Sequence, residues 1–298
     1  MSSQTSSAAP TGVGIIGLSA SGGWAAEAHL PALGWRDEVD LVVVAVKVPH
    51  HRELILPALE AGKMVLCDWP LGNGLAEAEE LAAVAEAQGV RTFVGLQARA
   101  APPLRYVPDL IADGYVGEVV STSIIASGIG WGAEFPPDGE QLLDRDNGAT
   151  MLTIPFGHTI DAVTMALGEF TELTATLATR RRQVRNQATG QRAPMTAPDQ
   201  IAVSGVLESG ALASVHFRGG LSRATNFHWE INGAAGASLL LVPGPTRHLW
   251  NGDVAPRGPC LRADPDRSRC RHPPRAGLHP RFASPSTAGP HPARRPRT

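Results

Sequence analysis

A glycine-rich turn near the start of the chain is the first stretch whose residue types suggest chemistry. The apolar run "VGII" (residues 13–16) leads into the loop "GLSASGGW". Gly17, Ser19 and Gly22 have the spacing G-x-S-x-x-G, and Gly23 follows directly. Such a turn between a strand and a helix points free backbone N–H groups at a pyrophosphate. We therefore expect a dinucleotide-binding turn, with an ordinary strand-to-helix turn as the alternative.

The elements that must position this turn alternate between short apolar strands and helices up to about residue 118. Uninterrupted Val/Leu runs separated by helices are typical of parallel strands that are covered on both faces. Gly62 and Gly89 stand where two of the helices should end. The expected strands span residues 13–18, 40–46, 64–68 and 91–97, and the expected helices span residues 23–33, 51–62 and 75–89.

From residue 119 the pattern changes to alternating strands interrupted by one helix at residues 157–169. Turn signals such as Ser209-Gly210 and Asn232-Gly233 separate several of the strands. The predicted fold class is therefore α/β: a Rossmann-like parallel sheet over residues 13–118, then an α+β domain with an open, mostly antiparallel sheet over residues 119–250.

Four stretches of the sequence match one family. They are "VGIIGLSASGGWAAEAHLPAL", "ALEAGKMVLCDWPLG", "GVRTFVGLQARAAPPLRYVPDLIADGYVGEV" and "NGATMLTIPFGHTID". They resemble the Gfo/Idh/MocA oxidoreductases, and within them the branch that contains the galactose-regulon repressor. The resemblance implies NAD or NADP as cofactor, hydride transfer to or from a sugar-like or polyol hydroxyl, and a second-domain sheet that supports homo-oligomers.

In such a fold, loops at the carboxyl ends of the strands line one crevice. The resemblance places the cofactor there, against Gly17, Ser19, Gly22, Gly23, Trp24, Val46, Lys47, His51, Asp68, Trp69, Pro70, Gln97 and Arg99.

The proton-transfer residues depart from the family pattern. The family's Glu-Lys-Pro tripeptide appears as Asp68-Trp69-Pro70, so Trp69 replaces the lysine that steers the hydroxyl proton. Trp69 is then either a packed aromatic residue or a flat wall against the ligand. His158 matches the family's active-site histidine, and Asp161, three residues later on the helix, is expected to hold its ring. Lys47 is a further candidate for the catalytic group.

A gap follows Leu33. The chain runs from "HLPALG" straight into "WRDEVDLVVVAV", where the family has a second and a third strand with their helices. The Rossmann sheet is therefore expected to lack these two strands, together with the residue that reads the adenosine ribose. Strand 13–18 would then be a bare edge. We expect NAD and NADP to bind weakly and with little discrimination.

Composition limits the remaining options. The 298 residues carry a net charge of -2, which argues against a general affinity for nucleic acid or membranes. Three cysteines form no disulfide framework, which favours a cytoplasmic protein, and no metal site is expected. Residues 1–12 are expected to be a disordered leader. Residues 251–298 are rich in Arg, Pro and His and are expected to be disordered, either as a natural basic tail or, as we favour, as the product of a frame change.

Three functions remain open from the sequence. The first is an oxidoreductase that depends on His158, and the second is a non-catalytic, NAD(P)-sensing regulator. The third is an inactive, truncated copy. Trp69 and Ile154, which stands where the family has an acidic residue, favour the regulator.

Overall fold

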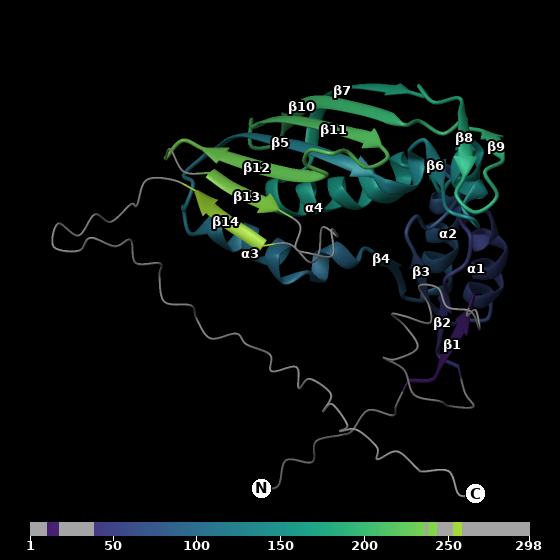
Figure 1. The fold of residues 1–298 in the computed structure, drawn as a ribbon. Helices are drawn as coiled ribbons and strands as arrows, with labels where there is room; N and C mark the ends of the chain where they lie inside the picture. The colour runs from purple at the N-terminus through teal and green to yellow at the C-terminus, as the bar shows by residue number, and fades with distance from the viewer. Residues whose placement is uncertain (1–10, 18–38, 236–237, 243–252, 258–298) are drawn as a thin grey trace, which may run out of the picture. The chain divides into compact units, whose positions relative to one another are not determined.

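A computed structural model describes residues 11–17, 39–235, 238–242 and 253–257 (Figure 1). The strands in these ranges form three sheets, of four, seven and three strands. No helix in these ranges is long and apolar enough to cross a membrane.

The four-stranded sheet is parallel throughout, as predicted, with the strand order β1-β2-β3-β4. Val13 of β1 lies opposite Leu41 of β2, so the first strand pairs directly with the strand that follows the gap. No strand in the described ranges pairs with the other edge of β1. The strands are β1 (Val13–Ile16), β2 (Leu41–Val44), β3 (Met64–Asp68) and β4 (Thr92–Gly95).

Helix α1 (His51–Glu60) packs against β2 and β3, and helix α2 (Leu75–Gln88) packs against α1. The predicted stop signals are confirmed, because Gly62 and Gly89 adopt positive φ angles of 69° and 63° just past the helix ends. The core of this part consists of Val44, Ile55, Leu59, Val65, Cys67, Leu81 and Ala85.

The seven-stranded sheet has the order β14-β13-β12-β5-β11-β10-β7. All neighbouring strands are antiparallel except β5 and β11, which confirms the expected mostly antiparallel sheet. Its strands are β5 (Val119–Gly128), β7 (Phe170–Ala178), β10 (Gln200–Leu207), β11 (Leu212–Gly219), β12 (Phe227–Gly233), β13 (Ser238–Val242) and β14 (Asp253–Arg257).

One face of this sheet is covered and the other is open. Helices α3 (Pro102–Ala112) and α4 (Gly157–Leu167) lie on the covered face (Figure 1). In β11 the alternation is plain, because Val215 and Phe217 are buried whereas Ser214 and His216 are exposed. Apolar residues at every second position thus direct one face to the core.

A third, small sheet was not predicted from the sequence. It joins β6 (Glu134–Phe135), β8 (Gln183–Asn186) and β9 (Arg192–Pro194), and β8 and β9 form a hairpin. Three arginines, at residues 180–182, precede β8. Asp199 is fully buried and accepts from the guanidinium of Arg181 at 2.8 Å.

Two details differ from expectation. Gly233, expected in a turn, is the last residue of β12, where a Cβ would lie 2.0 Å from the Val116 carbonyl oxygen.

Residues 253–257, assigned above to a disordered tail, form β14 and pair with β13. The sheet therefore extends further along the chain than apolar periodicity indicated, because a strand at the sheet edge needs backbone pairing more than an apolar pattern. Residues 1–10 of the expected leader and residues 251–252 and 258–298 of the expected tail lie outside the described ranges.

Candidate functional site

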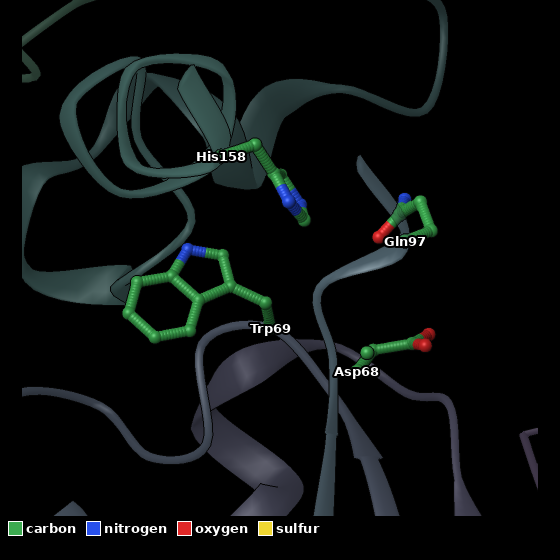
Figure 2. Close-up of a pocket in the computed structure, with 5 residues that line it drawn as sticks. Asp68, Trp69, Gln97 and His158 are labelled. Carbon is green, nitrogen blue, oxygen red and sulfur yellow. The ribbon is translucent and has the colours of Figure 1, made fainter. Parts of the chain in front are cut away.

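A small pocket lies where β3 and β4 end. Parallel strands bring their carboxyl ends to one edge of the sheet, so the residues after β3 and β4 meet there. Asp68, Trp69, Gly95 and Gln97 line the pocket together with His158 of α4, and Figure 2 shows the labelled side chains around it. Its volume is about 140 Å³. A cavity of about 150 Å³ holds one benzene molecule, so this pocket suits a single ring.

His158 stands in the first turn of α4, directly after a π-helical turn (Leu152–Phe156). Pro155 explains this turn: it has no N–H to donate, and the N–H of Phe156 instead reaches the Met151 carbonyl five residues back, at 3.1 Å. The His158 side chain is nearly buried. Burial lowers the pKa of His158, while the charges of Asp161 and Asp68 oppose that shift.

Trp69 links the end of β3 to this π-helical turn. Its indole N–H donates to the Thr153 carbonyl at 2.6 Å. Thr153 is also fixed through its hydroxyl, which accepts from the backbone N–H of Thr150 at 2.8 Å and donates to the Gly148 carbonyl at 2.5 Å. Neither Thr153 nor Gly148 was singled out in the sequence, although both lie in the motif "NGATMLTIPFGHTID".

Asp161 serves a different partner from the one expected. Its carboxylate accepts from Arg99, with Nε at 2.9 and 3.0 Å and Nη2 at 2.5 Å. The pair joins the 3₁₀ turn after β4 (Gln97–Ala100) to α4. It also raises the pKa of Arg99, chiefly through the hydrogen bond to Asp161. Asp161 therefore acts on His158 through its charge, and Arg99, expected at the cofactor, holds that charge in place.

His51, also expected at the cofactor, is buried between two loops. Its Nδ1 lies 2.9 Å from the Pro70 carbonyl, and its Nε2 lies 3.1 Å from the Val46 carbonyl. The Cys67 thiol is 3.2 Å from Nδ1, and burial raises the pKa of that thiol to about 12. His51 thus ties the loop after β2 to the loop after β3, which contains the cis peptide Trp69-Pro70.

The remaining expected residues are distributed as follows. Lys47 is exposed at the start of the 3₁₀ turn Val48–His50, and it is not among the residues that line the pocket. Gly17 has a φ of 100°, and a Cβ there would lie 2.1 Å from the Ala45 carbonyl oxygen, so the turn after β1 requires glycine. Ser19, Gly22, Gly23 and Trp24 lie outside the described residues.

Two comparisons with protein families cover most of the described chain. Residues 23–96 match the oxidoreductase family with an NAD-binding Rossmann fold. Residues 102–241 match the C-terminal domain of Gal80p. The boundary between the two matches falls at the start of α3.

Curated relatives include an enzyme and a regulator. The dehydrogenase aclE of Aspergillus oryzae is 41% identical over 138 residues, which are 46% of this chain and 37% of that protein. The galactose/lactose metabolism regulatory protein GAL80 of Saccharomyces cerevisiae is 28% identical over 327 aligned positions, covering 85% of this chain and 75% of that protein. Because 327 positions exceed the 298 residues of this chain, the yeast protein has residues where this chain has none.

The solved structures agree with the sequence matches. A crystal structure of a super-repressor mutant of Gal80p from Saccharomyces cerevisiae superposes with a TM-score of 0.75 at 25% identity, covering 83% of this chain and 78% of that one. The chain is therefore similar to an NAD-binding oxidoreductase domain over residues 23–96 and to the C-terminal domain of Gal80p over residues 102–241.

Proposed function

We propose that this chain is an NAD- or NADP-dependent oxidoreductase of the Gfo/Idh/MocA type that acts on a sugar-like or polyol hydroxyl in the cytoplasm. His158 is the group that accepts the hydroxyl proton. One observation supports the proposal most strongly. His158 lines the same pocket as Asp68, Trp69 and Gln97, at the carboxyl ends of β3 and β4. The family match over residues 23–96 supports a nicotinamide cofactor.

The chemistry requires a proton acceptor near neutral pH. A bound nicotinamide would accept or deliver the hydride, and the hydroxyl proton must leave to a nearby base. Burial lowers the pKa of His158 and so favours the neutral imidazole, which is the form that can take that proton. The charges of Asp161 and Asp68 then stabilise the imidazolium that forms. Lys47 is the alternative acceptor if His158 is dispensable.

The pocket fits one ring of the cofactor better than the whole molecule. Asp68, Trp69 and Gln97 would receive the nicotinamide end, and the turn at Gly17 would lie toward the pyrophosphate. Among the described residues no strand pairs with the outer edge of β1, so the adenosine end would lack its usual wall. Losing one ribose hydrogen bond costs about 0.5–1.5 kcal/mol, or roughly three- to tenfold in affinity. We therefore expect weak binding with little preference between NAD and NADP.

Calorimetric titration and a turnover assay test the proposal. NAD and NADP should bind weaker than about 10 µM, with similar affinities. A panel of sugars and polyols should then give reduction of NAD or NADP measured at 340 nm. The His158→Ala variant should still bind the dinucleotide and should lose that turnover. Unchanged turnover in His158→Ala would refute the assigned role, and micromolar binding with a clear preference would refute the argument from the gap.

A second candidate is a regulator that senses NAD(P) without turning it over. Two observations favour it. The Trp69 indole N–H donates to the Thr153 carbonyl, and residues 102–241 match a Gal80p domain. Dinucleotide binding with no turnover on any substrate of the panel would support this alternative.

The open sheet face is the surface we propose for homo-oligomers. Leu212 and Ile125 are exposed there, at 61% and 44%, on neighbouring strands β11 and β5. Sedimentation velocity of the parent protein and of Leu212→Glu tests this. A charged residue in a face-to-face contact should shift a dimer toward monomer, and a monomeric parent would refute the proposal.

A further inference from the structure

The Trp69 side chain, which stands where a lysine was expected, connects the end of β3 to the π-helical turn before α4. We propose that Trp69 is a positioning residue: its indole fastens the π-helical turn before α4 and so sets the direction from which His158 enters the pocket. Gly157 is its complement, because only a residue without a side chain leaves room for the indole. The inference rests on the proposed role of His158.

The hydrogen bond from Trp69 reaches a point that is fixed from several sides. The indole N–H donates to the Thr153 carbonyl at 2.6 Å, between residues 84 positions apart in the chain. The Thr153 hydroxyl is held by Thr150 and Gly148. The indole hydrogen bond therefore ties the π-helical turn, and the first turn of α4 that follows it, to the end of β3.

Gly157 has no backbone reason to be glycine. Its φ of -57° and ψ of -49° are ordinary helical values that alanine adopts more readily. A Cβ at this position, however, would lie 2.9 Å from Nε1 of Trp69 and 3.4 Å from its Cε2 and Cζ2. Moving the indole away from this Cβ would displace Nε1, the atom that donates to the Thr153 carbonyl. The glycine therefore accommodates Trp69.

The π-helical turn that Trp69 contacts lacks one of the backbone hydrogen bonds of a regular helix. Pro155 has no N–H, so this turn has one backbone donor fewer than a regular helical turn. Residues 157 and 158 are adjacent, so the indole contacts the backbone next to the imidazole. Figure 2 shows the indole and the imidazole on the same side of the pocket. Releasing the indole should expose His158 and bring its pKa back toward the ordinary value near 6.5.

A double-mutant cycle tests the pairing of Trp69 with Gly157. Gly157→Ala should lower the folding equilibrium constant by about fivefold to 150-fold, the range for overpacking a filled site. Trp69→Leu deletes all three indole atoms that the new Cβ would meet. In that background Gly157→Ala should be neutral or stabilising, because alanine favours the helix. An equal loss in both backgrounds would overturn the pairing.

A pH titration separates positioning from simple packing. Trp69→Phe keeps an aromatic ring but removes the N–H, and the imidazole signal of His158 in NMR should then titrate at a higher pH than in the parent. Trp131→Phe is the matched control, because the Trp131 indole N–H donates to the Leu142 carbonyl at 2.8 Å. This control should lose stability and leave the His158 titration unchanged. An unshifted His158 in Trp69→Phe, or an equal shift in the control, would overturn the proposal. Neither experiment uses a cofactor, so its outcome is independent of whether the protein binds NAD.

Discussion

Replacing Asp161 by asparagine probes the charge that acts on the candidate base. The Asp161 side chain is 12% exposed and accepts hydrogen bonds from both Nε and Nη2 of Arg99. The Arg99 side chain is 53% exposed. A hydrogen bond to a charged group contributes roughly 1.5–3 kcal/mol net. Water can replace the carboxylate at the exposed guanidinium, and solvent screens the pair, so we expect a loss of about 1 kcal/mol in the free energy of unfolding.

The same substitution should lower the pKa of His158 further. The carboxylates of Asp161 and Asp68 both oppose the effect of burial on that pKa, and asparagine removes the first of them. Urea unfolding measures the stability change, and an NMR titration of the imidazole signal measures the pKa.

Glu80→Gln is the control for this prediction. Glu80 also receives two hydrogen bonds from an arginine, Arg52, at 2.7 and 2.5 Å, but its charge is not among those that act on His158. The control should leave the titration of His158 unchanged. If Asp161→Asn left the pKa of His158 the same or raised it, the electrostatic reasoning would be refuted.

Three further predictions follow from buried groups. A neutral imidazole donates from one ring nitrogen, so His51→Phe leaves the Val46 or the Pro70 carbonyl without its donor and should cost roughly 1–3 kcal/mol in urea unfolding; a loss below about 0.5 kcal/mol would contradict this. Cys67, with its pKa near 12, should resist iodoacetamide at pH 8 in the native protein and react once unfolded, as peptide mass spectrometry can show. Because the pKa of His158 is lower in the folded than in the unfolded chain, its contribution to stability is complete above about pH 6.5 and declines as the pH falls below that value. The urea midpoint of the parent should therefore fall more between pH 7.5 and 5.5 than that of His158→Gln, and equal declines would argue against a lowered pKa.

The strands and the ends of the helices could be predicted from the sequence because their signals are local. Apolar runs located β2, β3 and β4, and Gly62 and Gly89 marked helix ends through a conformation that glycine adopts at little cost. Alternating residues likewise located β10 and β11. The small sheet of β6, β8 and β9 was missed, because strands this short are defined by backbone pairing rather than by an apolar pattern.

The roles of individual site residues were harder to predict, because they depend on contacts between distant segments. His51 and Arg99 follow strands at the expected edge, yet His51 contacts backbone carbonyls and Arg99 contacts Asp161. Position along the sequence indicates which loop a residue occupies, but not which neighbour its side chain reaches. The helical spacing of Asp161 from His158 predicted proximity and could not show that Arg99, 62 residues away, also reaches that carboxylate.

The central claim is that the pocket beside His158 receives the nicotinamide end of a dinucleotide. NMR signals of the His158 imidazole and the Trp69 indole N–H, followed while NAD, nicotinamide mononucleotide or AMP is added, test it most directly. We predict that NAD and nicotinamide mononucleotide shift both signals at high ligand concentration and that AMP leaves them unchanged. This prediction would be contradicted if NAD bound by calorimetry without moving either signal, or if AMP moved them as far as NAD does.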